Sequence, residues 1–382
     1  MSGDSGRATI RATVLRGGVV HDPETGVATG GDVRLADGII SNLPAAPSDD
    51  VIDVTGFVVA PGLVDLHTHV FSGQDLGVPA DDIAFPSGTT TIVDAGSAGA
   101  HLIGAFRATA VERSSVRIRA LLNISSIGTT SIRLGGELAS PWYVSEDAAV
   151  EAIEANRDFV FGVKVRASAD VGGAHTRAAL AAARRVADHV DLPLMVHLGP
   201  APAGVDEIVD TLRAGDILTH AFTGWEGNTV LGEDGRVRRS VRAARERGVL
   251  LDVGHGMSGF SFEVARRMIA EGQQPDTVST DIHTYSRDIV VDLPTVMSKF
   301  LALGMPFADV LRSATVTAAA AARSDAGTLR PGRPADVVVL ERVPGRVEYD
   351  DAFGGSAVGG ERLRVVMTYA GGRLEYDGRR LS

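Results

Sequence analysis

Cysteine is absent from the 382-residue sequence. Disulfide bonds, thiolate metal ligands and a cysteine nucleophile are therefore excluded. Any metal ion that the protein binds must be held by nitrogen and oxygen atoms.

Long hydrophobic runs are also missing. No apolar run approaches the roughly 20 residues that a membrane-spanning helix needs, and the first residues lack the basic and apolar regions of a secretion signal. These features predict a cytoplasmic protein that does not enter a membrane. The hydrophobic content of 44% and the charged content of 22% are ordinary for a globular chain, so a large core can form.

Positive charge is scarce, and lysine is the scarcer of the two basic residue types. The formal net charge is −11 and no basic run is interleaved with aromatic residues, which argues against nucleic-acid binding and favours a small-molecule substrate. Of the 37 lysine and arginine residues, only Lys164 and Lys299 are lysine. A homo-oligomer is compatible with this composition.

Two kinds of pattern divide the chain. Residues 1–60 and 326–382 contain short alternating or apolar runs between turn signals, which predicts β-structure that pairs the two ends of the chain. Residues 61–325 alternate apolar strands with amphipathic segments at intervals of roughly 30 residues, the length of a βα unit. We predict strands at 63–69, 90–95, 116–124, 159–165, 192–198, 216–221, 248–253 and 277–282.

The chain is thus predicted to be an α/β protein, with a (β/α)8 TIM-type barrel over 61–325 and a small β-sandwich domain from 1–60 and 326–382. Helices are expected at 293–302 and 307–322, and a flexible glycine-rich loop at 354–360.

The first predicted barrel strand ends in two histidines one residue apart. Because side chains alternate along a strand, His67 and His69 emerge on one face about 6–7 Å apart, and two imidazoles in that arrangement can share a metal ion. Such a pair also occurs by chance on surfaces. Four further potential ligands at the ends of other predicted strands favour the metal site: Lys164, His197, His220 and Asp281. Taken singly, the two later histidines would be core residues and the aspartate a helix cap.

Lys164 lies in an apolar strand, where an unpaired ammonium is costly. A chain that otherwise uses arginine for its cations has a lysine here, and a lysine amine can lose its proton and react covalently. Addition of CO2 would convert it into an anionic carbamate whose two oxygens can bridge two metal ions. A snorkelling or salt-bridged lysine is the alternative.

The combined motifs resemble the amidohydrolase superfamily of metal-dependent hydrolases. The resemblance rests on Pro-Gly-Leu-Val-Asp-Leu-His-Thr-His at 61–69, on the strand-end residues described above, and on Gly-Arg-Pro-Ala-Asp at 332–336. Within the superfamily the chain looks most like the deacetylase and dihydroorotase-like branch. Relatives there have stretches similar to Gly-Val-Lys-Val-Arg at 162–166, Thr-His-Ala-Phe-Thr-Gly at 219–224 and Ser-Thr-Asp-Ile-His-Thr at 279–284.

The resemblance implies a binuclear site for two divalent ions, most readily Zn²⁺. His67, His69 and Asp281 would hold one ion, and His197 and His220 the other. The carbamate on Lys164 would bridge the two ions together with a hydroxide that attacks the substrate. Asp281 would accept the proton of this hydroxide and pass it to the leaving group. D-aminoacylase-type relatives use a cysteine at the metal site, so their substrate is not carried over to this cysteine-free chain.

Three further residues are candidates for substrate contacts. Arg166 shares the inward face of Lys164, where it would either bind a substrate carboxylate or pair with an internal acid. His255 and His283 follow the last two predicted barrel strands, where they would either donate hydrogen bonds to the substrate or oxyanion or make ordinary loop contacts.

The sequence thus predicts an enzyme that cleaves an amide or ester bond of a small acylated substrate, as a deacetylase does. Reversible ring opening of a cyclic amide, as in dihydroorotases, is a second hypothesis, and a metal-free scaffold protein is a third. Serine-hydrolase chemistry is disfavoured, because neither Gly-Ser-Ala-Gly at 96–99 nor Gly-Met-Ser-Gly at 256–259 has the spacing of a nucleophile elbow.

Overall fold

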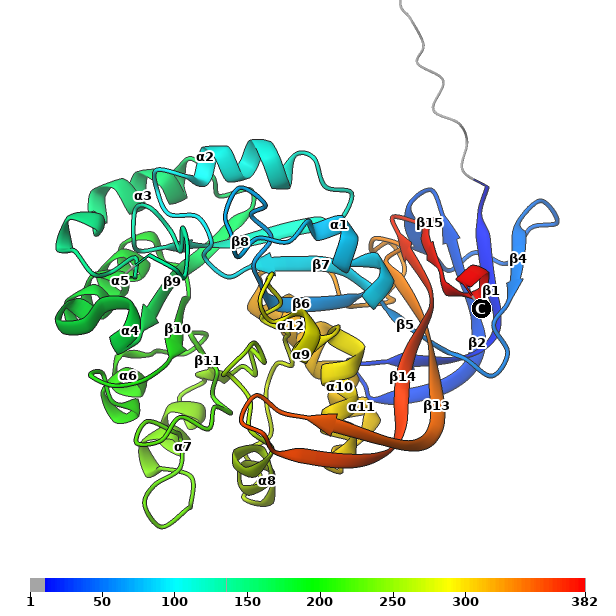
Figure 1. Ribbon diagram of the computed structural model, residues 1–382. Helices are drawn as coiled ribbons and strands as arrows, with labels where there is room; N and C mark the ends of the chain where they lie inside the picture. The colour runs from blue at the N-terminus through cyan, green and yellow to red at the C-terminus, as the bar shows by residue number, and fades with distance from the viewer. Residues whose placement is uncertain (1–10, 135, 382) are drawn as a thin grey trace, which may run out of the picture.

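The computed structural model describes residues 11–134 and 136–381. Two sheets organise them: a curled parallel sheet of seven strands and a mixed sheet of eight strands built from both ends of the chain (Figure 1). The first ten residues, on which the prediction about secretion depended, lie outside the described part.

The parallel sheet follows the order of the chain, with every neighbouring pair of strands parallel. Its strands are β6 (Leu63–Thr68), β7 (Thr89–Asp94), β8 (Arg117–Asn123), β9 (Val160–Ala167), β10 (Leu194–Leu198), β11 (Ile217–Thr219) and β12 (Leu250–Leu251). Alternate side chains such as Leu66, Phe161 and Met195 form one buried cluster, whereas Leu63 and Val163 belong to the larger cluster that includes the helices. Both faces of the sheet are therefore buried, which explains its nearly continuous apolar strands.

The eighth predicted strand is only partly formed. Residues 277–282 make two isolated parallel bridges, one from Thr277 to Asp252 and one from Ile282 to Thr68. Between them, Thr280 donates its N–H and its hydroxyl to the Asp65 carboxylate at 3.0 and 2.6 Å, and Asp281 has a φ of +49°. A side-chain acceptor and a left-handed residue thus replace the regular ladder. The segment lies between β12 and β6 but is not a regular strand, so the prediction of eight regular strands is wrong in this detail.

Helices follow most strands and cover the outside of the parallel sheet (Figure 1). They are α1 (Ala80–Ile83), α2 (Ile103–Phe106), α3 (Glu146–Glu154), α4 (Ala169–Gly172), α5 (Thr176–Val190), α6 (Val205–Thr211), α7 (Arg239–Glu246), α8 (Phe262–Ala270), α9 (Arg287–Val290), α10 (Leu293–Ala302), α11 (Phe307–Ser313) and α12 (Val316–Ala321). The single helix predicted at 307–322 is interrupted between α11 and α12, where Thr315 leaves helical geometry at φ −133° and ψ −101°.

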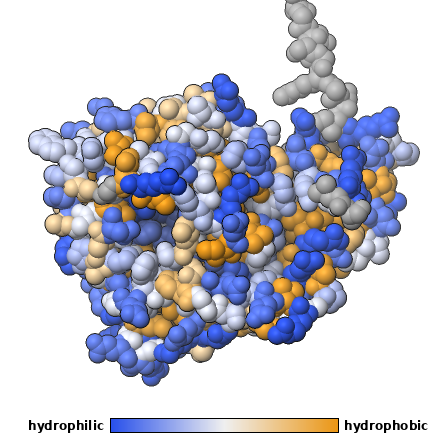
Figure 2. Space-filling view, in the orientation of Figure 1, coloured by the Kyte–Doolittle hydropathy of each residue, from blue (hydrophilic) through white to orange (hydrophobic). Residues whose placement is uncertain are grey.

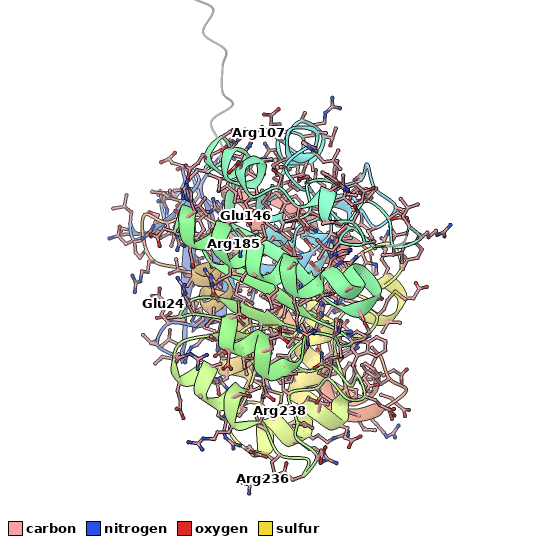
Figure 3. The ribbon with its side chains drawn as sticks, turned by 90° about the vertical axis from the view of Figure 1, so that its left-hand side faces the viewer. Glu24, Arg107, Glu146, Arg185, Arg236 and Arg238 are labelled. Carbon is pink, nitrogen blue, oxygen red and sulfur yellow. The ribbon has the colours of Figure 1, made fainter. Side chains whose placement is uncertain are left out.

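The longest helix, α5, shows why these segments pack on the sheet. Its buried residues include Ala179, Ala183 and Val186, which recur at helical spacing on one face. On the outer face, Arg185 of α5 lies beside Glu146 of α3 (Figure 3), with an Nη2–Oε1 distance of 2.6 Å. Both side chains are largely exposed, so such a pair stabilises the fold by about 0–1 kcal/mol. The inward apolar face therefore determines where the helix lies.

The mixed sheet joins the two ends of the chain in the order β15-β14-β13-β5-β1-β2-β3, with β4 paired to β1. Its strands are β1 (Thr13–Asp22), β2 (Val27–Ala36), β3 (Ile39–Ser41), β4 (Asp50–Asp53), β5 (Val58–Pro61), β13 (Val337–Asp350), β14 (Ser356–Ala370) and β15 (Arg373–Asp377). One face buries a separate apolar cluster that includes Leu15, Val59 and Met367. The predicted pairing of the two ends is present as one mixed sheet in the described residues, rather than as the two facing sheets of a sandwich.

The predicted flexible loop at 354–360 is mostly strand. β14 begins at Ser356 and pairs with β13 from Asp350 onward, so the turn is confined to 351–355. This long hairpin passes α10 and reaches the start of α8 (Figure 1), where Phe262 N–H donates to Asp351 at 2.7 Å. The glycines at 359 and 360 therefore lie within an antiparallel ladder.

In the described ranges, no helix is both long and apolar enough to span a membrane. Hydrophobic and hydrophilic residues are interspersed over the face shown in Figure 2.

Candidate metal centre

The six residues predicted as metal ligands lie at the C-terminal ends of the parallel strands. His67 is in β6 and His69 follows its end, Lys164 is in β9, and His197 is in β10. His220 directly follows β11, and Asp281 lies in segment 277–282. His67, His220 and Asp281 are far apart in the sequence. One ligand atom from each of them nevertheless lies within 4.8 Å of the ligand atoms of the other two.

Asp281 lies between His67 and His69. Its Oδ1 is 3.4 Å from His67 Nε2 and 3.3 Å from His69 Nε2. Two ligand atoms at about 2.1 Å from one tetrahedral zinc ion are about 3.4 Å apart. Asp281 Oδ1 is thus at ligand spacing from both imidazoles, as it would be if all three residues bound one divalent ion.

The imidazoles are held with Nε2 toward this centre. His67 Nδ1 lies 2.8 Å from Thr219 Oγ1, whose hydroxyl donates to Asp252 at 2.7 Å, so the histidine nitrogen is the donor of the first bond. His220 Nδ1 donates to the Gly254 carbonyl at 2.6 Å. His220 Nε2 is buried and has no hydrogen-bond partner among the described residues. An outward N–H bond with a free Nε2 is the arrangement that metal-binding histidines adopt.

Burial keeps these rings neutral. It lowers the pKa of His69 and of His220 to about 4, and it lowers the pKa of His67 and of His197 well below the usual value. The ring of His197 meets His220 edge-on, with centroids 4.3 Å apart. Neutral imidazole is the form that binds metal ions, so the residues present fit a site for a divalent cation.

Lys164 lies among these rings with 1% of its surface exposed. Its Nζ is 3.2 Å from His67 Nε2 and 3.3 Å from Met195 Sδ, and the described residues offer it no ion pair. Burial lowers its pKa to about 7, although Asp281 and Asp252 act in the opposite direction. The side chain therefore neither snorkels nor forms a salt bridge, and burial favours the unprotonated amine, which is the form that carbamate formation requires.

The backbone at the centre is strained at two positions. His220 and Asp281 have φ values of +60° and +49°, a region that residues other than glycine seldom occupy. The loop 254–259 lies against both. A Cβ added to Gly256 would be 2.1 Å from Asp281 Oδ2, and one added to Gly259 would be 2.4 Å from His220 Nδ1. Glycine is required there because the loop backbone touches the site.

The candidate substrate residues differ in how many of their polar atoms already have protein partners. Arg166 forms a bidentate pair with Glu137, at 2.7 and 2.6 Å, and Glu137 is 3% exposed. The guanidinium is therefore paired with an internal acid, one of the two roles considered for it. Its contact with a substrate stays a prediction.

His255 and His283 lie in different environments. Both ring nitrogens of His255 have protein partners, since Nε2 meets Lys299 Nζ at 2.8 Å and Nδ1 meets the Gly256 carbonyl at 3.0 Å. His283 lies near the centre, with its ring centroid 6.1 Å from that of His69. Its Nδ1 accepts from Tyr285 N–H at 3.2 Å, so Nε2 is its remaining donor. Of the two, His283 is the better placed to donate to a substrate.

Sequence reasoning missed several residues that support the centre. Glu137 lies in an irregular loop without any strand signal. Asp252 accepts from Thr219, Thr277 and Ser279 and so holds the ends of three neighbouring strands together. Asp252 directly follows the apolar pair Leu250-Leu251, and this position could have marked it as a residue at a strand end. Lys299 could have been noticed because lysine is so rare in this chain.

Known proteins similar to this chain share one family. The sequence profile of the amidohydrolase family matches residues 58–374. A deacetylase of Agrobacterium fabrum is 34% identical over 364 residues, which cover 92% of this chain and 89% of the relative. A deacetylase of Brucella anthropi is 35% identical over 342 residues, or 88% of this chain and 84% of the relative.

Two solved structures match most of the chain. A structure described as a dihydroorotase matches with a TM-score of 0.88 and 32% identity, over 95% of this chain and 97% of its own. A second, described as an adenine deaminase, matches with a TM-score of 0.88 and 28% identity, over 96% and 100%.

Proposed function

The chain belongs to the amidohydrolase family, and we propose that it is a binuclear metal-dependent hydrolase of the deacetylase type, acting on an amide or ester bond of a small acylated substrate. The observation that carries the proposal is the set of buried, neutral imidazoles around Asp281, with an unpartnered His220 Nε2 among them. A scaffold protein gains nothing from an unsatisfied buried acceptor, which lowers stability unless something binds it.

Under this proposal, His67, His69 and Asp281 would hold one divalent ion, His197 and His220 would hold the other, and carboxylated Lys164 would supply oxygen ligands to them. Zinc suits these nitrogen and oxygen ligands. When bound, the ions would acidify a water molecule enough to make it a nucleophile at neutral pH and would polarise the scissile carbonyl.

The protein's own groups then move the proton and hold the substrate. Asp281 accepts the proton of the attacking water on its free carboxylate oxygen and returns it to the leaving nitrogen or oxygen. His283 donates from Nε2 to the oxygen on which negative charge develops. The Asp252 network keeps His67 in the tautomer that leaves Nε2 unprotonated.

We also propose that segment 277–282 completes a closed (β/α)8 barrel, which is supported by its bridges to both edges of the seven-stranded sheet. The domain boundaries at 60/61 and 325/326 are part of this proposal, which is supported by the change of sheet between β5 and β6 and between β12 and β13. Pro61 itself is the last residue of β5. A cytoplasmic enzyme with a small-molecule substrate completes it.

Ring opening of a cyclic amide is a second candidate, favoured by the match to the structure described as a dihydroorotase. Purified, zinc-loaded protein should be assayed against N-acyl amino acids, O-acetyl hydroxy acids and cyclic amides, with elemental analysis of the same sample. We expect close to two equivalents of divalent metal and release of the acyl group. Turnover of cyclic amides alone would favour the second candidate.

The matched variants are His69→Asn, which removes a proposed ligand, and His101→Asn, which alters an exposed histidine outside the centre. Only the first should lose metal and activity. A wild-type metal content near zero that loading does not raise would refute the binuclear site.

A further inference from the structure

Lys299 is the second of the two lysines in the chain and is buried in α10, with 2% of its surface exposed. Its Nζ donates to His255 Nε2 at 2.8 Å and to the Ile289 carbonyl at 3.3 Å. No ion pair joins it to a carboxylate in the part of the chain that the structure describes. A buried ammonium with only neutral acceptors is costly, so its presence requires a reason.

The partner of Lys299 is a fully buried imidazole. His255 stacks on Phe260, with centroids 4.9 Å apart and an interplanar angle of 29°. Because Nε2 accepts from an ammonium, the ring proton is on Nδ1, which donates to the Gly256 carbonyl at 3.0 Å. Lys299 therefore fixes both the tautomer and the orientation of His255.

The loop that contains His255 supports two residues of the proposed metal centre. The Gly254 carbonyl accepts from His220 Nδ1 at 2.6 Å. The N–H groups of His255 and Gly256 donate to the carbonyls of Ser279 and Thr280, at 3.2 and 2.8 Å. Gly256 also lies directly against the Asp281 carboxylate. A shift of this loop would thus move a histidine and the proposed proton acceptor together.

We propose that Lys299 is a positioning residue for the hydrolytic reaction: by holding His255, it fixes the loop 254–259 and, through that loop, the tautomer of His220 and the place of the Asp281 carboxylate. The inference rests on the proposed function for its catalytic consequence. The positioning itself follows from the contacts.

Lysine suits this position better than arginine. Its compact ammonium donates one hydrogen bond to a single imidazole nitrogen and a second to a carbonyl oxygen. The wide planar guanidinium of arginine needs several acceptors in its plane. His220 and Asp281 are also the two strained residues of the centre. A strained conformation persists only where surrounding contacts enforce it, and the loop 254–259 supplies contacts to both.

The test compares Lys299→Met with Ser298→Ala. The second variant lies on the same helix and is equally buried, but its hydroxyl meets Pro294 O and Leu363 N–H rather than the loop. Loss of such supporting contacts typically lowers activity by about 10–100-fold. We expect Lys299→Met to lower kcat by at least about tenfold with little change in KM, and Ser298→Ala to leave kcat near that of the wild type.

Two further measurements separate positioning from general damage. In the double variant Lys299→Met/His255→Leu, kcat should be no lower than in the worse single variant, because both changes break one chain of contacts. In NMR spectra of histidine-labelled protein, Lys299→Met should shift the Nδ1–H signals of both His255 and His220, whereas Ser298→Ala should shift neither. If Lys299→Met does not fold, His255→Leu takes its place, since it removes the other half of the same hydrogen bond.

A kcat within about twofold of the wild type, or an unchanged His220 signal, would overturn the proposal. The NMR result does not depend on turnover. If the wild type hydrolyses none of the acyl substrates but the His220 signal responds to Lys299→Met, the proposed function fails while the positioning role stands.

Discussion

Gly256→Ala should damage the reaction far more than it damages the fold. The added Cβ would lie 2.1 Å from Asp281 Oδ2, 3.0 Å from its Cγ and 3.3 Å from its Cβ. The whole side chain is thus crowded, and rotation of the carboxylate alone does not relieve the contact. Asp281 also has little freedom to retreat, because its N–H donates to the His67 carbonyl at 2.6 Å.

The size of the effect follows from the displacement. Non-bonded carbon and oxygen atoms need at least about 3 Å, so the carboxylate or the loop must move by about 1 Å. A displacement of about 1 Å at a reacting group can lower turnover by about 10²-fold. Alanine at a left-handed position also destabilises the fold by about 1–2 kcal/mol. We therefore expect kcat to fall by about 10² while KM changes much less.

Gly272→Ala is the matched control. Its φ of +72° imposes the same kind of backbone strain, but no atom lies within 4 Å of the added Cβ. Both variants should lose thermal stability in melting experiments through backbone strain, with a further loss in Gly256→Ala from the overlap. Only Gly256→Ala should lose turnover when assayed with saturating zinc. Equal kcat values for the two variants would refute the claim that contact between the loop and Asp281 limits the reaction.

Three other predictions test the centre. Lys164→Ala should lose metal and activity together, with partial recovery in an excess of a short carboxylic acid; full activity and metal content in Lys164→Arg would contradict the carbamate. Asp281→Asn should keep most of its metal, by elemental analysis, but lower kcat by at least about 10², and near-normal turnover would leave Asp281 a simple ligand. Burial lowers the pKa of Lys299 from 10.5 to about 8, against the opposing charges of Asp350 and Asp351. Between pH 8 and 10.5 the unfolded chain therefore binds more protons at Lys299 than the folded protein does, so the free energy of unfolding rises with pH. The melting temperature of the wild type should accordingly rise relative to that of Lys299→Met from pH 8 to 10. A constant difference in melting temperature would contradict the lowered pKa.

The positions of the proposed ligands could be predicted because they depend on local rules. Alternation along a strand places His67 and His69 on one face, and a parallel arrangement brings the C-terminal ends of all strands to one edge. Lys164 stood out because its apolar neighbours predicted burial in a chain that almost always uses arginine. These signals lie within a few residues of each side chain, so a single sequence contains them.

The errors arose where distant contacts decide the local conformation. Segment 277–282 has the apolar pattern of a strand, but the Asp65 carboxylate takes the place of a backbone acceptor for Thr280. Glycines 359 and 360 indicated a loop, yet Gly359 pairs with Val347 of β13, and Gly360 lies at a register shift within the same antiparallel ladder. Glu137 lies in a loop and is important only because Arg166 reaches it from β9. No periodicity along the chain reports such contacts.

The stretch Gly-His-Gly-Met-Ser-Gly at 254–259 shows how the same residues change meaning once their contacts are known. In the sequence it served to exclude a serine nucleophile, and His255 was a candidate substrate donor. In the structure, the glycines allow the backbone to touch Asp281 and His220, while His255 points away from them toward Lys299. Two of the proposed ligands thus depend on packing that the fold itself supplies, and part of the folding free energy maintains their geometry.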